Sequence, residues 1–537
     1  MIIHSDGSKR EELRQEWCPV RIMDSYNVDS SDELLVSKPA SISFQLDHCA
    51  QFNGAGSWIL LDFGKELCGS VRILTRAINN NHTTKWRITF GESASEACSS
   101  IGEKNATNDH SPRDFEMMTS NMSDQIIGQT GFRFVRLELL EDVTVLIQSI
   151  FAVSVLPALE REATIVTNDS LVNDIINTAA YTLKLNFQNG YVWDGIKRDR
   201  LVWCGDLHPE ILTSLYIFGD TPNIQNSLDF LRESTPADQW VNGIPTYSAW
   251  WVINLCDYCN ITGRPDYYTA NRDYALKVME HINSCIAEDG TLLLDGNGSL
   301  SLFLDWSTHE TPDEPYGVAS QLRFAAMKFL EMEENTDCRD ILRKLECYLD
   351  HETTRKPVRA FQVLAGRNHP EADAAMLQAG GAKDMSTFLS YYILSATASA
   401  GGTDMLDMLK SYYGGMLSRG ATSFWEDFDI EWLEGSSRID ELPKPGEKDL
   451  HGDYGRYCYT QLRHSLCHGW SSGVLAFIIE YIVGIKIADG GKIVTVQPHL
   501  LGLTDIDATI PMSNGELKVS IHDGQVNVTA PEGTKVN

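Results

Sequence analysis

The stretch that decides the fold reads NDSLVNDIINTAAYTL and runs from Asn168 to Leu183. Asn168, Asp169 and Ser170 are residue types that cap helices, and the apolar residues from Val172 onward recur at helical spacing. Before this point, the apolar residues follow the two-residue period of strands. The sequence therefore predicts that a β-rich part gives way here to a helical part.

The chain before this stretch is rich in short strand-like runs. Phe132–Leu139 alternates apolar and polar residues, as a strand with one wet face does. Other such runs are Trp58–Phe63, Gly69–Leu74 and Trp86–Phe90. We therefore expect an N-terminal β-sandwich domain over residues 1–165. The polar, turn-rich stretch from Ser99 to Asn121 is expected to be a long loop.

Helical patterns dominate the chain after this stretch, up to about residue 485. They are Glu210–Phe218, Ile224–Arg232, Asp266–Ile286, Ser320–Glu334, Asp337–Asp350, Asp384–Ala400, Asp404–Leu417 and Ser472–Val483. Strands do not alternate with these helices, and no repeat of fixed period is present, which favours a closed helical array over a solenoid. A toroid of helical hairpins and a bundle both fit residues 166–487.

Strand patterns return from Lys492. Two hairpin signals, Asn514-Gly515 and Asp523-Gly524, separate alternating runs. We therefore expect a small C-terminal β-domain over residues 488–537.

Composition limits the partners of the chain. A total of 74 acidic and 44 basic residues gives a net charge of -30, which repels phosphate backbones and anionic lipids. Nucleic acid and membrane surfaces are therefore not expected as partners, and a neutral substrate suits the charge better. The first residues, Met1 to Gly7, lack the features of a signal peptide, and no apolar run approaches the ~20 residues of a spanning helix. A soluble, cytoplasmic protein is expected.

Neither a metal nor a cofactor is expected. The 12 cysteines have no regular spacing, and the single CxxC pair, Cys256 and Cys259, lacks a second pair at zinc-site distance. The glycine pairs at Gly401 and Gly414 have neither a P-loop lysine nor a preceding strand, so no nucleotide cofactor is inferred. The sequence does not indicate an oligomeric state.

The segment from Tyr191 to Asp206 is the candidate for chemistry, because it combines carboxylates with tryptophans. If its later part is helical, Asp199, Trp203 and Asp206 share one face. Two carboxyl groups beside an aromatic surface suit glycoside hydrolysis, in which one protonates the leaving oxygen and the other activates water. A structural cluster in which Arg198 and Arg200 pair with the aspartates remains the alternative from composition alone.

The residues of this segment follow the pattern Asp194-x-x-x-Arg198-Asp199-x-x-x-Trp203-x-Gly205-Asp206. This pattern resembles the signature loop of the inverting α-L-rhamnosidases, glycoside hydrolase family 78. Later motifs that recur in that family's order are Asp305-Trp306, Gly420–Glu426 and Ser465–Trp470. The N-terminal Leu61–Gly64 and Gly91–Ser93 also look like that family's β-sandwich.

The resemblance implies a fold and a set of roles. The fold is an (α/α)6 barrel flanked by β-domains, and the activity is the release of terminal α-L-rhamnose. Asp199 takes the general-acid position and Glu426 the general-base position. The expected substrate-binding residues are Asp194, Arg198, Trp203, Asp206, Trp306, Trp425 and His468, with one of Trp250 or Trp251.

The chain also departs from the family pattern. The family commonly has glutamate where this chain has Asp199, and a Cys-Pro pair stands where this chain has Gly195-Ile196. Aspartate is one methylene shorter than glutamate, so its carboxyl group lies further from the substrate. This matters because catalysis is sensitive to ~1 Å of misplacement. Another departure is the long polar insertion over residues 427–463, which is either a wall of the leaving-group subsite or a solvated loop.

Two other functions stay open. One is a six-hairpin glycosidase of another specificity, such as an α-L-fucosidase, and the other is a carbohydrate-binding homologue with impaired turnover. For catalysis, we expect Lys197, Arg198 and Arg200 to point away from Asp199, because a cation in contact favours the ionised carboxylate, which cannot donate a proton.

Overall fold

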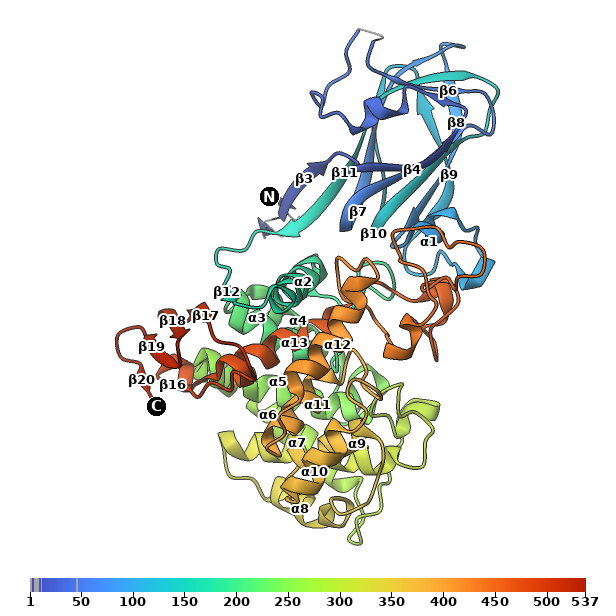
Figure 1. Cartoon of the computed structure of the whole chain (residues 1–537). Helices are drawn as coiled ribbons and strands as arrows, with labels where there is room; N and C mark the ends of the chain where they lie inside the picture. Colours follow the sequence, from blue (N-terminus) through green and yellow to red (C-terminus); the bar gives the residue numbers. More distant parts are fainter. Residues whose placement is uncertain (1, 4–8, 11, 45–46) are drawn as a thin grey trace.

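A β-sandwich, a helical body and two small sheets make up the molecule (Figure 1). The computed structural model describes residues 2–3, 9–10, 12–44 and 47–537. The first residues, from which a cytoplasmic protein was predicted, lie largely outside these ranges. In the described part of the chain, no helix combines the length and apolar character needed to cross a membrane.

One nine-stranded antiparallel sheet folds over on itself to form the sandwich. Its strands are β3 (Glu12–Trp17), β4 (Arg21–Tyr26), β5 (Val28–Asp29), β6 (Ala50–Asn53), β7 (Trp58–Ile78), β8 (Thr83–Gly91), β9 (Asp114–Ser120), β10 (Ser123–Leu139) and β11 (Thr144–Pro157). The first part of β7 pairs with β4 and its later part with β11, while β10 runs along both parts. Register shifts in these pairings allow the long strands to bend between the two layers.

Two predictions for this region are corrected. The separate runs at Trp58–Phe63 and Gly69–Leu74 belong to the single strand β7. The expected loop from Ser99 to Asn121 contains β9, which pairs with β8. Every second residue of β9 faces the sheet, and the residues between them are exposed. These exposed residues are mostly polar, so the segment has the composition of a loop.

The helical body is an (α/α)6 barrel, as the resemblance implied. Its helices are α2 (Ser170–Asn186), α3 (Leu207–Ile217), α4 (Pro222–Ser234), α5 (Pro245–Thr262), α6 (Pro265–Ser284), α7 (Glu314–Met332), α8 (Thr336–Lys344), α9 (Lys356–Leu364), α10 (Pro370–Gln378), α11 (Ser390–Ser399), α12 (Met405–Ser418) and α13 (Gly473–Phe477). Helices α3, α5, α7, α9, α11 and α13 contact one another in that order, and α13 closes the ring onto α3. The alternate helices pack outside this ring.

The capping prediction for α2 is confirmed. The Asp169 side chain accepts hydrogen bonds from the backbone N–H groups of Leu171 and Val172. Helices α5, α9 and α10 were not predicted. Helix α5 is buried on almost every side, because it faces both the barrel axis and the outer layer, so it shows no amphipathic period.

Two small sheets lie beside the barrel (Figure 1). One contains β12 (Thr164–Thr167), β17 (Ile506–Met512), β18 (Gly515–His522) and β19 (Gln525–Thr529), and the other contains β15 (Ile485–Ala488), β16 (Ile493–Val496) and β20 (Lys535–Val536). The predicted hairpin at Asp523-Gly524 is confirmed, since both residues have positive φ between the paired residues His522 and Gln525. The domain limits themselves stay a prediction.

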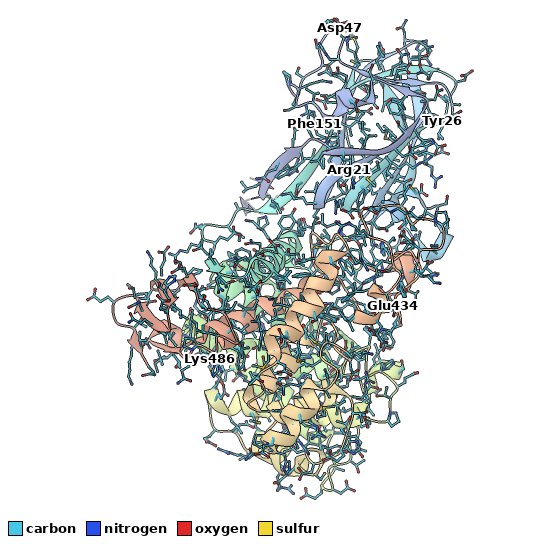
Figure 2. All side chains as sticks on the ribbon, in the orientation of Figure 1. Arg21, Tyr26, Asp47, Phe151, Glu434 and Lys486 are labelled. Carbon is cyan, nitrogen blue, oxygen red and sulfur yellow. The ribbon has the colours of Figure 1, made fainter. Side chains whose placement is uncertain are left out.

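Two arginines of the sandwich reach the segment after α12. Arg133 on β10 and Arg21 on β4 both bind the Asp62 carboxylate within the sandwich, and Arg133 also donates to the backbone oxygen of Gly420 at 3.0 Å. Arg21, labelled in Figure 2, also donates to the backbone oxygen of Asp440, 2.8 Å away. The Asp440 segment follows α12, so the sandwich is fixed against the loops at one end of the barrel.

Candidate active site

Three loop segments, distant in sequence, meet at the end of the barrel that faces the sandwich. The loop after β14 (Tyr191–Val192) forms an isolated β-bridge between Gly195 and His468. The His468 N–H donates to Phe424 O at 2.9 Å, and the Glu426 N–H donates to Ser465 O at 3.0 Å. These backbone bonds bring together the three motifs that the sequence analysis singled out.

The loop from Asp194 to Asp206 is not helical, which corrects the helical alternative considered for it. Asp199 and Arg200 have φ of 52° and 58°, in the left-handed region that a helix excludes. The loop is closed by the Leu201 N–H, which donates to the Asp194 carboxylate at 2.8 Å. Asp199 and Trp203 nevertheless meet, because the Trp203 Nε1–H donates to Asp199 Oδ2 at 3.2 Å.

A cavity of about 90 Å³ lies at this junction. The predicted site residues that line it are Asp194, Arg198, Asp199, Trp203, Asp206, Trp306, Glu426 and His468. The lining residues without a predicted role are Ile244, Tyr247, Leu300, Phe303, Cys458, Tyr459 and Trp470. The carboxyl groups of Asp199 and Glu426 therefore border the same space.

Glu426 is held rigidly at the inner side of this cavity. Only 1% of its side chain is exposed, and one oxygen contacts the Arg198 guanidinium in a short ion pair. The other oxygen accepts the Ser465 N–H at 2.9 Å. Both oxygens thus have a fixed direction, as a group that orients a water molecule needs.

Asp199 lies nearer the solvent, with 20% of its side chain exposed. Besides Trp203, its carboxylate is approached by His110 Nε2 at 3.4 Å and by Arg198 Nη1 at 3.8 Å. The expectation that the basic neighbours point away is wrong for Arg198, which lies between the two carboxylates. It holds for Lys197, which binds Glu92, and for Arg200, which lies over the Trp193 ring.

Asp194, Asp206 and His468 form a buried polar floor. His468 Nε2 lies 3.7 Å from Asp194, 3.9 Å from Asp206 and 3.6 Å from Glu426. Burial raises the pKa of both aspartates well above its usual range, and neighbouring carboxylates add to the rise. Burial also lowers the pKa of His468, with Arg198 contributing. Burial therefore favours the neutral forms of these three groups, which can donate or accept hydrogen bonds at the floor of the cavity.

Aromatic rings form the walls. Trp203 meets Tyr247 edge-on, with ring centroids 6.1 Å apart, and Trp306 meets Tyr459 at 6.0 Å. Tyr459 also lies beneath the Arg198 guanidinium, 4.8 Å from its ring centroid. Trp203 and Trp306 are both partly exposed at the cavity, as predicted for sugar-stacking residues.

Three predicted tryptophans do not reach the cavity. Trp250 and Trp251 on α5 are completely buried, and Trp425 is 1% exposed. Trp250 packs among His208, Phe361, Phe388 and Tyr392, and Trp251 packs against Tyr274. Trp425, in the loop after α12, packs against Phe428. All three are core residues, and Trp250 and Trp251 are buried because α5 is covered on almost every side.

The insertion over residues 427–463 is folded against the site and includes Glu434, labelled in Figure 2. Arg456 binds Asp427 at 3.3 Å and Asp429 at 3.0 Å, and Trp432 is buried. Tyr459 from this segment lines the cavity. These contacts favour the interpretation of this insertion as a wall of the cavity over its interpretation as a solvated loop.

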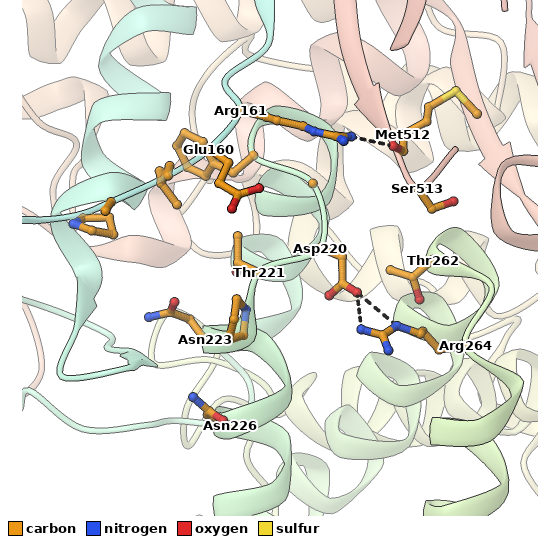
Figure 3. Close-up of a pocket in the computed structure, with 16 residues that line it drawn as sticks. Glu160, Arg161, Asp220, Thr221, Asn223, Asn226, Thr262, Arg264, Met512 and Ser513 are labelled. Atoms are coloured by element: carbon orange, nitrogen blue, oxygen red, sulfur yellow. Dashed lines mark hydrogen bonds and ion pairs between the residues drawn. The ribbon is translucent and has the colours of Figure 1, made fainter. Parts of the chain in front are cut away.

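A roomier cavity of about 710 Å³ lies elsewhere, where α4 and the α5–α6 turn meet the C-terminal sheet (Figure 3). Three of its charged groups have partners, since Asp220 pairs with Arg264 and Arg161 donates to the Met512 carbonyl. None of the predicted site residues lines it. The volume of a cavity therefore does not identify the candidate site. The smaller cavity is the candidate because the carboxyl groups of Asp199 and Glu426 both border it.

Sequence reasoning missed His110, Tyr247, Tyr459 and Trp470. His110 stands in the polar stretch before β9, far in sequence from Asp199, and no periodicity marks it. Trp470 belongs to a motif that was recognised, so its ring could have been counted with the walls. Tyr459 lies in the insertion, where the sequence carries no structural signal.

Comparison with known proteins gives one family match. Residues 160–262 match the model of the bacterial alpha-L-rhamnosidase 6 hairpin glycosidase domain, and this range contains the Asp194 to Asp206 loop. No protein of the curated set matches the chain significantly.

Solved structures show the same fold. A family 78 rhamnosidase of Bacillus sp. GL1 is 19% identical with a TM-score of 0.72, over 94% of this chain and 55% of that one. A rhamnosidase from Klebsiella oxytoca with rhamnose bound is 18% identical with a TM-score of 0.68, over 88% of this chain and 96% of that one. An α-L-rhamnosidase of Streptomyces avermitilis complexed with L-rhamnose is 15% identical with a TM-score of 0.65, over 89% of this chain and 48% of that one.

The chain therefore spans about half the length of the Bacillus and Streptomyces proteins and nearly all of the Klebsiella one. The shared fold covers most of this chain in each of these comparisons. Residues 160–262 thus match the bacterial alpha-L-rhamnosidase 6 hairpin glycosidase domain, and the chain has the fold of the family 78 rhamnosidase of Bacillus sp. GL1.

Proposed function

We propose that this chain is an inverting, exo-acting glycoside hydrolase that releases terminal α-L-rhamnose, with Asp199 as the general acid and Glu426 as the general base. The observation that carries the proposal is the pairing of these two carboxyl groups around one small cavity. Asp199 lies at the accessible side, where a leaving group departs, and Glu426 is buried at the inner side.

The placement of Arg198 supports inversion over retention. Inverting glycosidases keep their two carboxyl groups roughly 6.5–9.5 Å apart, so that a water molecule fits beside the sugar. Here the Arg198 guanidinium lies between Asp199 and Glu426 and keeps them apart. A separate void of about 10 Å³ borders Glu426 and Asp427, close to the least volume that accommodates one water.

His110 supplies a proton route to Asp199. Its Nε2 lies 3.4 Å from Asp199 Oδ1, and 31% of the histidine side chain is exposed. An imidazole can hold a proton on either ring nitrogen, so His110 can relay a proton from solvent to the carboxylate between turnovers. The general acid is then the Asp199–His110 pair, in which Asp199 contacts the glycosidic oxygen.

The cavity lining suits a neutral 6-deoxy sugar. Asp194, Asp206 and His468 offer hydrogen-bonding groups for hydroxyls, while Ile244, Leu300 and Phe303 are apolar and suit the C6 methyl group of L-rhamnose. L-fucose carries the same methyl group, which keeps an α-L-fucosidase as the nearest alternative specificity. The rhamnose present in two of the similar structures favours rhamnosides.

Mutation of the two carboxyl groups tests the roles. Asp199→Asn and Glu426→Gln should each lower kcat on an aryl α-L-rhamnoside by at least about 10³-fold, because each removes one half of the proton transfer. The Asp199 variant should recover partly on a substrate whose leaving group needs no protonation, and the Glu426 variant should not. Wild-type turnover by either variant would contradict its assignment.

One observation favours a second function, carbohydrate binding without turnover. Trp203 already donates a hydrogen bond to Asp199, and His110 and Arg198 lie 3.4 Å and 3.8 Å from its carboxyl group, so donor groups surround these oxygens before a leaving group arrives. A panel of aryl glycosides, including rhamnosides and fucosides, separates the functions. Binding of L-rhamnose by calorimetry with no aryl alcohol released from any substrate would establish the binding protein.

A further inference from the structure

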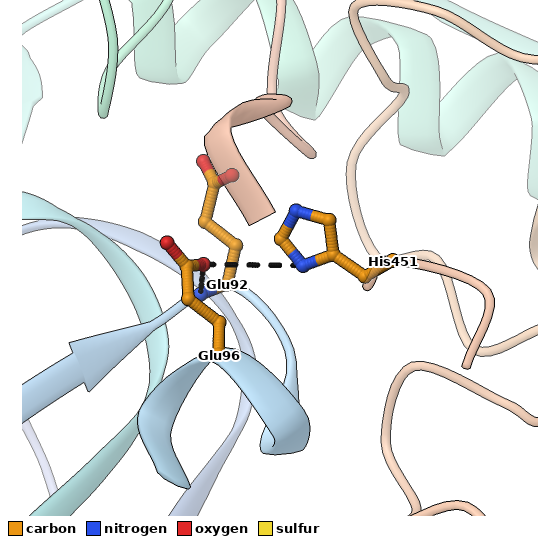
Figure 4. A group of neighbouring side chains, drawn as sticks. All are labelled: Glu92, Glu96 and His451. Carbon is orange, nitrogen blue, oxygen red and sulfur yellow. Dashed lines mark hydrogen bonds and ion pairs between the residues drawn. The ribbon is translucent and has the colours of Figure 1, made fainter. Parts of the chain in front are cut away.

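A buried polar cluster lies where the sandwich meets the catalytic loops. It consists of Glu92 after β8, Glu96 on α1 (Ala94–Cys98), Lys197 and His451, and we call it the Lys197 cluster (Figure 4 shows the two glutamates and the histidine). The exposed fraction of these residues is between 0% and 7%. Charged groups this deeply buried need specific partners.

The cluster has the residue types that bind metal ions, but the Lys197 ammonium group already supplies its positive charge. The two glutamates and His451 present ligand atoms within 4.8 Å of one another. However, Lys197 Nζ lies 3.1 Å from a carboxylate oxygen of each glutamate. Both nitrogens of His451 are also used, Nδ1 with Ser93 Oγ at 2.7 Å and Nε2 with His464 O at 2.9 Å. The Lys197 ammonium group thus takes the place a metal ion would have.

Glu92 contacts two catalytic segments at once. Its carboxylate accepts hydrogen bonds from Ser465 Oγ at 3.1 Å and from the Leu466 N–H, and it forms the ion pair with Lys197. Lys197 in turn donates to the backbone oxygens of Leu462 and His464. A single side chain of the sandwich therefore fixes both the Lys197 loop and the 462–466 segment.

Each of these two segments is directly connected to a proposed catalytic group, one through a hydrogen bond and the other along the chain. The Ser465 N–H donates directly to Glu426 Oε2 at 2.9 Å. Lys197 directly precedes Arg198 and Asp199, the residues that contact Glu426 and Trp203. A shift of Ser465 or Lys197 would therefore move both carboxyl groups relative to the sugar.

We propose that Glu92 is a positioning residue for the hydrolytic reaction, and that through it the N-terminal sandwich is part of the catalytic unit. This inference rests on the proposed function. Glu92 touches neither substrate nor water, and acts through the Ser465–Glu426 hydrogen bond and the Lys197 loop.

The test is Glu92→Gln, which keeps the size of the side chain but presents an amide N–H₂ to a site filled with donors. On an aryl α-L-rhamnoside, kcat should fall by about 10²-fold, the effect typical of a ~1 Å misplacement. KM should stay within about threefold, because the sugar-binding walls are not altered. The loss should persist with a leaving group that needs no acid, because the base is displaced.

Asp62→Asn is the matched control. Asp62 is a buried carboxylate of the same sandwich, and it binds Arg133 and Arg21, which reach the Gly420 and Asp440 carbonyls, away from the cavity. If the sandwich only docks onto the barrel, both variants should lower Tm and neither should lower kcat of the folded protein. Our inference predicts that only Glu92→Gln lowers kcat.

A crystal structure of Glu92→Gln gives a readout that does not depend on turnover. The Ser465–Leu466 segment should move, and the hydrogen bond from Ser465 to Glu426 should be lost. If Glu92→Gln folds poorly, Glu92→Asp keeps the charge for Lys197 but retreats from Leu466, and should show an intermediate loss of kcat. An unchanged Ser465–Glu426 geometry, or wild-type kcat in an active enzyme, would overturn the inference while leaving the proposed function intact.

Discussion

Asp199 is held in a backbone conformation that few residues adopt. It and Arg200 both have positive φ, and such conformations persist where the surrounding structure fixes them, often at functional sites. The Leu201 to Asp194 hydrogen bond closes the loop around them. Trp203 and His110 then approach the short aspartate from two sides. These contacts fix the direction of the Asp199 carboxyl group, for which we propose the general-acid role.

The tryptophans give a prediction that separates walls from core. Trp306→Ala removes a partly exposed ring from the cavity, and losing about 0.5–1.5 kcal/mol of ring contact should raise KM several-fold with little change in Tm. Trp250→Ala should instead cost about 3–5 kcal/mol of stability, because it leaves a cavity in the core. Steady-state kinetics and thermal unfolding of both variants provide the measurements. If Trp250→Ala instead raised KM and left Tm unchanged, Trp250 would have to be assigned to the substrate-binding site.

At the residue level, the sequence predicted the cavity well where motif and chemistry agreed. Asp194, Asp206, Glu426 and His468 all line it. Trp250, Trp251 and Trp425 do not, because the sequence does not distinguish a tryptophan buried in the core from one that faces a cavity. His110 could not be predicted, since only the docking of the sandwich brings it to Asp199.

At the level of elements, helix α2 depends on its first turn. The Asp169 side chain caps two N–H groups and also binds Lys410 on α12. Asp169→Ala should therefore lower the stability of the fold by about 1–2 kcal/mol, seen as a fall in Tm. Asp174→Ala, at an exposed position of the same helix, is the control and should leave Tm almost unchanged. An equal fall in both variants would show that the cap contributes nothing specific.

Periodicity predicted elements with a clear contrast between a buried and an exposed face, and it missed elements without that contrast. Helix α2 and the Asp523-Gly524 hairpin have clear signals, namely a cap, a helical period and a pair of turn residues. Helix α5 has almost no polar face, and β9 has the composition of a loop. The insertion over residues 427–463 has little regular structure, and its contacts with the barrel depend on tertiary packing.

At the scale of the whole molecule, buried acids near the cavity make stability depend on pH. Glu210 is 1% exposed, and neither of its oxygens has a hydrogen-bond partner. Burial raises its pKa well above 4.5, with Asp206 and Asp194 adding to the rise. Because the folded state holds this proton to higher pH than the unfolded chain, the stability it contributes is fully present below pH 4.5 and is lost as pH rises through the folded pKa.

Glu210→Gln cannot lose a proton, so it should gain stability relative to the wild type as pH rises, by at most about 1.4 kcal/mol per pH unit. The two proteins should have similar Tm near pH 4.5, and the variant should have the higher Tm at pH 8. Glu116→Gln, on the exposed face of β9, should show no such divergence. Parallel Tm curves for Glu210→Gln and the wild type would mean that Glu210 does not ionise within the fold.

The order of strand-rich, helical and strand-rich parts could be predicted from the sequence, and so could the barrel, through the family resemblance. The joining of these parts could not. The Lys197 cluster and the hydrogen bond from Arg133 to the Gly420 carbonyl connect residues far apart in the chain, and no local pattern encodes such contacts. The same contacts bring the sandwich residues Glu92 and His110 to the catalytic loops.

The most direct test of the account follows the anomer formed first by the wild-type protein. Proton NMR during hydrolysis of an aryl α-L-rhamnoside should show β-L-rhamnose first, with the α anomer appearing only later through mutarotation. That result requires water to attack the face opposite the leaving group, as the Asp199 and Glu426 assignment demands. Initial release of α-L-rhamnose, or no release of sugar, would contradict it.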